Sequence, residues 1–165
     1  MGTRGLTIDP LMTRILAFLA GIDIPVLIEA LEEDTLLPAM TIRDGALVID
    51  PARLTWPGDI LHEAGHIAVT DPAMRATLGE LESDPAEEMA AIAWSYAAAI
   101  EIGIDPKIVF HDDGYRGGGG YLADAFTGGM FPGMPMLQWF GMTLDPRTAK
   151  AQGLAPFPHM LRWLR

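Results

Sequence analysis

Residues 60–70 read ILHEAGHIAVT, and this stretch decides both the fold and the function that we expect of the chain. Its apolar residues recur at the spacing of an α-helix, and Thr55-Trp56-Pro57-Gly58-Asp59 before it is typical of a helix start. We expect this helix to end at Asp71-Pro72, because a proline disfavours helical backbone in the residue before it. Residues four apart share one face of a helix, so His62 and His66 would lie side by side.

The segment from His62 to His66 has the pattern H-E-x-x-H, which predicts a metal site. Two imidazoles on one helical face can reach a single tetrahedral ion, and zinc prefers nitrogen ligands of this kind. Glu63 lies one step round the helix, poorly placed to be a ligand but well placed to act as general base on a water. The alternative is a pair of histidines that only make surface hydrogen bonds. Because two of the four histidines of the chain lie in this one motif, we favour the metal site.

A catalytic zinc site needs a third protein ligand, and the chain has no cysteine to provide it. We expect the longest helix over residues 86–102, with Glu87 and Glu88 in its first turn. If Asp84 is the N-cap, Glu87 falls at the acidic position of a capping box and has a structural role, whereas Glu88 has none. We therefore favour Glu88 as the third ligand, with Glu87 and His111 as the alternatives.

The H-E-x-x-H motif, followed 22 positions later by Glu88-x-x-Ala-x-x-Trp, resembles the gluzincin zinc metallopeptidases, and above all the small ImmA/IrrE-like domains. The resemblance covers about residues 40–100, including a strand element before the first motif helix. It implies that His62, His66 and Glu88 hold Zn²⁺ as the cofactor. Glu63 would then be the catalytic base of a zincin peptidase.

We therefore expect a zinc-dependent peptidase, in which a water activated by Glu63 attacks a peptide bond. An alternative from another class is a regulatory module that keeps the zinc site and acts by contacting a partner protein, without proteolysis. Replacement of Glu63 discriminates between them, because only the enzyme needs a general base. In zincins a His or Tyr often stabilises the oxyanion, so His111, Tyr115 or Tyr121 could serve here, or could be ordinary loop residues.

The chain as a whole predicts a single domain, residues 1–165, of α+β class. It would be a mostly helical minimal zincin domain with a small β-hairpin before the H-E-x-x-H helix. Residues 11–20 and 24–33 carry apolar residues at mixed helical spacing and predict two helices. Residues 40–50 contain Asp44-Gly45 between β-prone residues, which is a strong hairpin signal.

The C-terminal third is rich in glycine and proline, and we expect little regular structure in most of it. Five glycines lie within residues 114–120 and indicate either a mobile flap over a cleft or a solvated loop. We expect a short helix near residues 137–142 and a final turn at residues 159–164.

The net charge and the composition of the chain restrict the classes of partner that we expect it to bind. The chain has 22 Asp and Glu against 11 Lys and Arg, a formal net charge of −11. This balance disfavours nucleic acid and anionic membrane surfaces, since both require a basic surface. No apolar run approaches ~18 residues, and we see no signal peptide. We therefore expect a cytoplasmic protein without a membrane span that acts on a peptide or protein substrate, with its oligomeric state left open.

Overall fold

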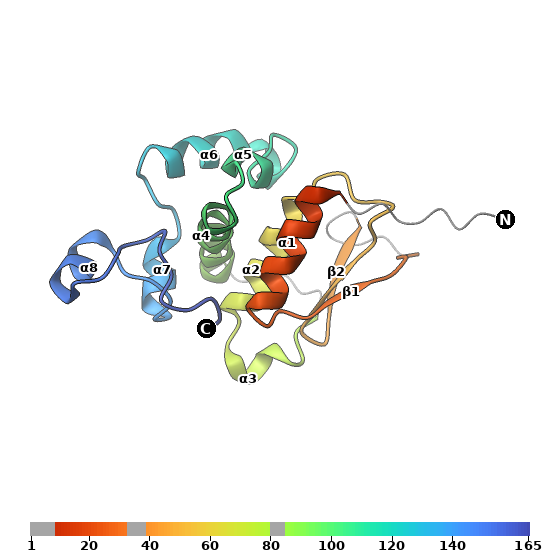
Figure 1. The fold of residues 1–165 in the computed structure, drawn as a ribbon, viewed down its shortest axis with the longest axis horizontal. Helices are drawn as coiled ribbons and strands as arrows, with labels where there is room; N and C mark the ends of the chain where they lie inside the picture. The colour runs from red at the N-terminus through yellow and green to blue at the C-terminus, as the bar shows by residue number, and fades with distance from the viewer. Residues whose placement is uncertain (1–8, 33–38, 80–84) are drawn as a thin grey trace.

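The computed structural model describes residues 9–32, 39–79 and 85–165, and every structural statement below concerns these residues. The elements are α1 (Pro10–Gly21), β1 (Val26–Ile28), β2 (Met40–Arg43), β3 (Ala46–Ile49), α2 (Asp59–Val69), α3 (Pro72–Arg75), α4 (Pro85–Ile102), α5 (Pro106–Val109), the 3₁₀ helix η1 (Tyr115–Gly117), α6 (Gly119–Thr127), α7 (Met134–Trp139) and α8 (Pro146–Gln152). Helices α1, α2 and α4 lie at the centre of Figure 1, with the sheet on one side and α7 and α8 on the other. This architecture confirms the expected α+β, mostly helical class.

The hairpin expected over residues 40–50 is confirmed, because β2 and β3 pair antiparallel within it. The turn residues Asp44 and Gly45 both have positive φ, 50° and 74°, as a type I′ hairpin turn requires. Glycine is also needed at the second position for lack of space, since a Cβ on Gly45 would lie 2.3 Å from the carbonyl oxygen of Arg75. The turn therefore packs against the end of α3.

The helix expected over residues 24–33 is wrong for the described part of that range, because residues 26–28 form strand β1. Residue 33 lies outside the described residues. β1 runs parallel to β3 at one edge of the sheet, whose order is β1-β3-β2, and the N–H of Leu47 donates to the carbonyl of Pro25. A short apolar run is compatible with a helix or a strand. Here the run forms a strand because it can pair with β3, which is buried at all four positions.

The two helices that carry the motif residues, α2 and α4, are confirmed within a residue or two of the expected bounds. The expected N-cap Asp84 lies outside the described residues. The helices approach closely, since a Cβ on Gly65 would lie 2.9 Å from the Ala91 carbonyl oxygen and 3.3 Å from the Trp94 ring. Trp94 is fully buried, and its indole N–H donates to the carbonyl of Trp163 at 2.9 Å.

The glycine-rich segment is more regular than expected. Residues 115–117 form η1, and α6 begins inside the glycine run at Gly119. Gly119 packs directly on the preceding chain, since a Cβ there would lie 1.9 Å from the carbonyl oxygen of His111. Glycine permits close packing at this position. The expectation of little regular structure is therefore wrong for residues 115–117 and 119–120, whereas residues 114 and 118 are a bend and a turn.

The C-terminal part also differs in detail from the expectation. The short helix expected near residues 137–142 begins earlier, as α7 over residues 134–139. Helix α8 was not expected; the side chain of Asp145 caps it by accepting from the N–H of Thr148 at 2.8 Å. Residues 159–164 form bends and an isolated bridge instead of a regular element.

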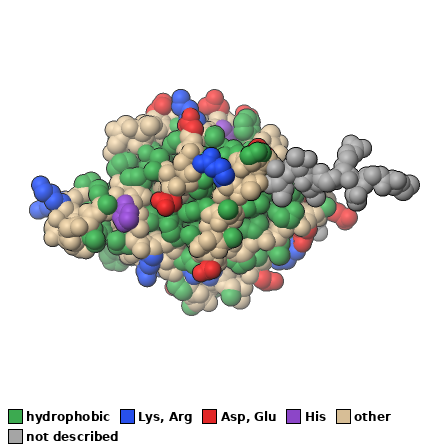
Figure 2. All heavy atoms as spheres, viewed as in Figure 1, with side chains coloured by type: hydrophobic (Ala, Val, Ile, Leu, Met, Phe, Trp, Pro, Cys, Tyr) green, Lys and Arg blue, Asp and Glu red, His purple; other side chains and the backbone are tan. Residues whose placement is uncertain are grey.

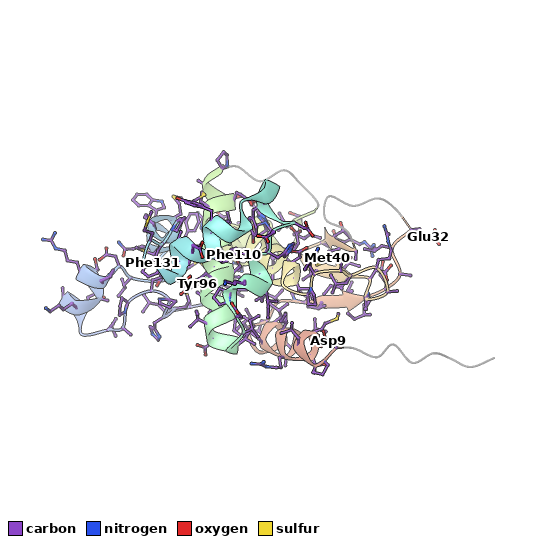
Figure 3. The ribbon with its side chains drawn as sticks, turned by 90° about the horizontal axis from the view of Figure 1, so that it is seen from above. Asp9, Glu32, Met40, Tyr96, Phe110 and Phe131 are labelled. Atoms are coloured by element: carbon purple, nitrogen blue, oxygen red, sulfur yellow. The ribbon has the colours of Figure 1, made fainter. Side chains whose placement is uncertain are left out.

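Aromatic rings fill the space between α4 and α6. Phe126 stacks on Tyr96 at 4.6 Å and on Phe110 at 5.3 Å, and Phe131 meets Phe157 edge-on at 5.0 Å. Figure 3 shows Tyr96, Phe110 and Phe131 gathered around α4. Because Phe110 directly follows α5, this cluster fixes the start of the segment that leads to η1.

Hydrophobic side chains cover much of the face shown in Figure 2. The Lys and Arg side chains on this face are scattered and do not gather at one place. Within residues 9–32, 39–79 and 85–165, no helix has the length and apolar character needed to cross a membrane.

Candidate metal centre

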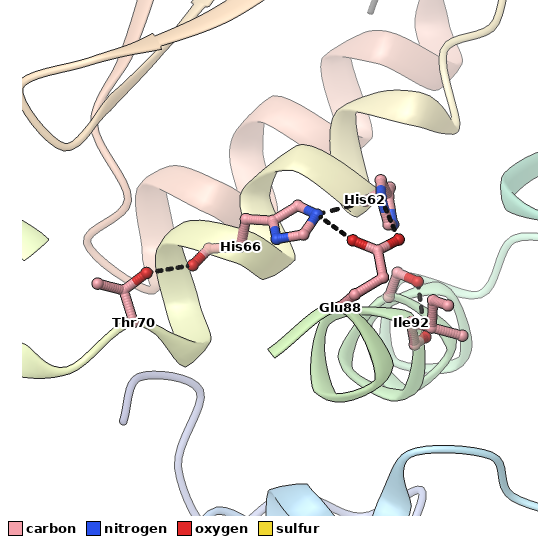
Figure 4. Close-up of polar contacts among 6 residues, drawn as sticks. His62, His66, Thr70, Glu88 and Ile92 are labelled. Carbon is pink, nitrogen blue, oxygen red and sulfur yellow. Dashed lines mark hydrogen bonds and ion pairs between the residues drawn. The ribbon is translucent and has the colours of Figure 1, made fainter. Parts of the chain in front are cut away.

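Helices α2 and α4 bring three titratable side chains together. His62 and His66 lie one turn apart on α2, and Glu88 reaches them from the first turn of α4 (Figure 4). The Nε2 atom of His62 is 3.3 Å from Glu88 Oε1, and that of His66 is 2.9 Å from Glu88 Oε2. The two Nε2 atoms are 3.2 Å apart. Three residues were candidates for the third ligand: Glu88, Glu87 and His111. Of these, Glu88 belongs to the group, whereas Glu87 and His111 do not.

Two of these spacings, 3.2 and 3.3 Å, are close to the edge of a tetrahedral metal site, and the third, 2.9 Å between His66 and Glu88, is shorter. With zinc–ligand bonds of about 2.0–2.1 Å, two ligand atoms of a tetrahedron lie about 3.3–3.4 Å apart. One ligand atom from each of the three residues lies within 4.8 Å of the others. The group could therefore hold a metal ion, and a fourth position would stay open. Imidazole and carboxylate ligands suit several divalent metals, zinc among them.

The group is also coupled electrostatically. Burial acts to raise the pKa of Glu88, but its hydrogen bonds with His62 and His66 and their charges outweigh burial and hold the pKa far below its usual range. Burial acts to lower the pKa of His66, but the hydrogen bond to Glu88 and the charge of Glu63 outweigh it and raise the pKa. Without a metal, the carboxylate therefore stays ionised and stabilises a protonated imidazole.

The centre is partly open to solvent. The side chains of His62 and His66 are 13% and 15% exposed, and that of Glu88 is 38% exposed. Glu63, the predicted base, is half-buried on α2 directly after His62. At the end of α2, the hydroxyl of Thr70 donates to the carbonyl of His66 at 2.6 Å (Figure 4). Among the described residues, the carboxylate of Glu88 is therefore the most solvent-exposed part of the group.

His111 lies outside this group and has partners of its own. Its Nε2 atom is 2.6 Å from Oδ1 of Asp59, the first residue of α2. Its ring stacks on the indole of Trp56, with the ring centroids 4.3 Å apart and the planes at 14°. Sequence reasoning did not anticipate Asp59 or Trp56 in this role. In the sequence, these two residues indicated only the start of a helix.

Tyr115 contacts the centre through the ring of His62, with centroids 5.0 Å apart and planes at 79°. Its φ is 55°, which is unusual for a bulky residue. Its buried hydroxyl makes no hydrogen bond of regular geometry among the described residues, although the Ser95 side chain is close enough to lower its pKa. Burial outweighs this effect and raises the pKa of Tyr115 far above its usual range. Tyr121, considered for the same role from sequence, is 67% exposed on α6.

Comparisons with known proteins assign no family to the chain. It matches no protein-family model, no curated protein and no solved structure. A functional statement about this protein therefore depends on the chemistry of the centre.

Proposed function

We propose that the protein is a zinc-dependent peptidase that hydrolyses a peptide bond with an activated water. The observation that most supports this is that α2 and α4 bring one ligand atom each of His62, His66 and Glu88 within 4.8 Å of one another, a set of ligands that suits tetrahedral zinc. Three protein ligands with an open fourth position are typical of catalytic zinc, whereas structural zinc sites have four protein ligands. The resemblance of the two motifs to ImmA/IrrE-like domains supports a peptide as the substrate.

Zinc bound in such a centre lowers the pKa of a water and polarises a carbonyl group. Glu63 is the residue that we assign as general base. Its charge raises the pKa of His66, which supports a position close to the centre. The Glu63 carboxylate would accept the proton of the attacking water and deliver it to the leaving amine as the peptide bond breaks.

The test of this proposal is Glu63→Gln, which preserves the size of the side chain but cannot accept the proton. We expect the variant to keep its fold and its zinc and to lose kcat by about 100-fold or more. Glu101→Gln is the matched control, because Glu101 is exposed at the far end of α4. Zinc is measured by elemental analysis, and cleavage by mass spectrometry of a peptide library incubated with each protein.

Cleavage by Glu63→Gln at the wild-type rate would contradict the assigned base. A wild-type protein that binds zinc, cleaves no peptide of the library and keeps its biological effect after Glu63→Gln would favour the alternative, a regulatory module that binds a partner protein. Absence of zinc from wild-type protein after exposure to the metal would exclude both functions.

A further inference from the structure

The ring of His62 lacks the support that a metal-binding histidine usually has. In most such sites the second ring nitrogen donates to a carboxylate or carbonyl, and this hydrogen bond fixes the orientation of the ring. The Nδ1 atom of His62 is buried and has no hydrogen-bond partner among the described residues. Its Nε2 atom faces Glu88 and His66. Among the described residues, contacts other than a hydrogen bond to Nδ1 therefore hold the ring in this orientation.

Two rings pack edge-on against that of His62: the ring of His66, with the centroids 4.8 Å apart, and the ring of Tyr115. Since His66 is itself a member of the metal group, Tyr115 is the one that restrains His62 from outside it. Its ring meets that of His62 nearly at right angles, 79°, with the centroids 5.0 Å apart. An edge-to-face contact of this kind is a favoured arrangement of two rings and restricts the rotation of each. Tyr115 can restrain His62, however, only if its own backbone is held in place.

The backbone of Tyr115 is in a conformation that needs such support. A φ of 55° is strained for a bulky residue and persists only where the surrounding structure determines it. Two backbone bonds close the turn: the N–H of Gly117 donates to Gly114, and that of Gly118 donates to Tyr115, both at 3.0 Å. The ring of Phe110 packs on that of Tyr115 at 5.4 Å. These contacts shape the turn, but they do not tie it to α2.

Two contacts tie this segment to α2: α5 packs on the residue before the helix, where a Cβ on Gly58 would lie 2.0 Å from the carbonyl oxygen of Ile108, and His111 pairs with Asp59. The Nε2 to Oδ1 distance of 2.6 Å is short, and the two side chains are only 8% and 16% exposed. Asp59 lies three residues before His62 on α2, and the N–H of Gly114 donates to the carbonyl of His111 at 3.1 Å. The stack on Trp56 holds the imidazole from one face. The pair thus joins the start of the turn to the first turn of the helix that carries His62.

We infer that Asp59 and His111 are positioning residues: they hold the turn that presses Tyr115 against His62, and so orient the His62 ring toward Glu88 and His66. This inference deepens the proposed function and depends on it only in so far as His62 is a metal ligand. The positioning itself is a property of the metal-free protein and can be measured there.

The test follows the ring signals of His62 in ¹H–¹³C NMR spectra of the metal-free protein, assigned by their loss in His62→Gln. Tyr115→Leu removes the neighbouring ring and should shift these signals. Asp59→Ala and His111→Ala should shift them in the same direction, because the turn is released. Asp59→Asn, whose amide oxygen still accepts the hydrogen bond, should shift them less.

A matched control is Asp105→Ala, which removes an acid that caps α5 by accepting from the N–H of Lys107 at 2.9 Å. It should leave the His62 signals in place. If His111→Ala does not fold, His111→Phe keeps a ring on Trp56 and still removes the bond to Asp59. Unchanged His62 signals in Asp59→Ala and in the folded His111 variant, beside a shift in Tyr115→Leu, would overturn the inference.

A second readout is the rate at which zinc passes from the loaded protein to a chelator. Loss of a residue bonded directly to a ligand typically costs 10–100-fold in metal affinity. Asp59 acts on His62 only through the turn and Tyr115, so we expect the smaller effect, release from Asp59→Ala up to about tenfold faster than from wild type or Asp105→Ala. Equal release rates in Asp59→Ala and the control would contradict the inference. If wild type binds no zinc, the proposed function fails, whereas the NMR comparison still decides whether the pair positions His62.

Discussion

Oε2 of Glu88 lies 2.9 Å from Nε2 of His66, although the two residues belong to different helices and are 22 positions apart. The other oxygen of the same carboxylate lies 3.3 Å from Nε2 of His62. A half-buried carboxylate between two imidazoles attracts a positive charge to the centre, either a proton on a histidine or a metal ion. Protons and metal should therefore compete for this group.

The free energy of unfolding of the metal-free protein should depend on pH through these residues. The raised pKa of His66 stabilises the fold below the usual value of 6.5, and this contribution is lost as the pH rises through the raised pKa. The lowered pKa of Glu88 stabilises the fold above the usual value of 4.5, and this contribution is lost as the pH falls through the lowered pKa. Both contributions act together between these two usual values.

We therefore expect urea unfolding of the metal-free protein to give a higher free energy at about pH 5.5 than at about pH 8.5. Glu88→Gln removes the charge that raises the pKa of His66, so the difference between the two pH values should shrink. A difference of the same size in wild type and variant would show that the pair does not titrate as its geometry indicates.

The third ligand is tested by comparing Glu88→Ala with Glu87→Ala. Loss of Glu88 leaves two imidazoles, which hold zinc far more weakly, so we expect the affinity to fall by at least about tenfold. Glu87 is also in the first turn of α4 but outside the group, so its variant should keep the metal. Equilibrium dialysis against zinc measures both. The reverse pattern would assign the ligand to Glu87.

Tyr115→Phe should stabilise the fold or leave its stability unchanged. The substitution keeps the ring against His62 and removes a buried hydroxyl that makes no hydrogen bond of regular geometry among the described residues, although Ser95 lies near it. Relief of that desolvation should raise the free energy of unfolding by about 1 kcal/mol. Tyr121→Phe, at an exposed position, is the control and should have no effect. A loss of stability in Tyr115→Phe alone would show that the hydroxyl has a partner in solution.

Gly65→Ala tests the close approach of the motif helices. The added Cβ would lie 2.9 Å from the carbonyl oxygen of Ala91, a backbone atom of α4 that cannot move alone. We expect this overpacking to lower the free energy of unfolding by about 1–3 kcal/mol. The higher helix propensity of Ala acts in the opposite direction and offsets ~1 kcal/mol of that loss. Gly21→Ala, where a Cβ meets nothing within 4 Å, is the control. Equal stability of the two variants in thermal or urea unfolding would contradict this packing.

Local patterns predicted the parts of the fold whose cause is local. The helical period around His62 and His66 predicted α2, and Asp44-Gly45 predicted the hairpin turn with its two positive φ values. The choice of Glu88 over Glu87 also came from a local argument about capping, and the structure brings Glu88 to the histidines. Periodicity failed over residues 26–28, because a short apolar run does not show whether a strand is available to pair with it.

The sequence by itself determined the H-E-x-x-H helix and the hairpin before it, since spacing within a helix or turn follows from backbone geometry alone. It favoured Glu88 as the acid, but the packing of α4 on α2 is what brings Glu88 to the histidines. Only the tertiary structure decided how that centre is held. His111 and Asp59 are 52 positions apart, and no period or motif connects them. The same is true of Tyr115 and His62, whose rings meet only through the packing of the segment after α5 against α2. Contacts of this kind depend on how the elements pack in three dimensions, which no local pattern in the chain records.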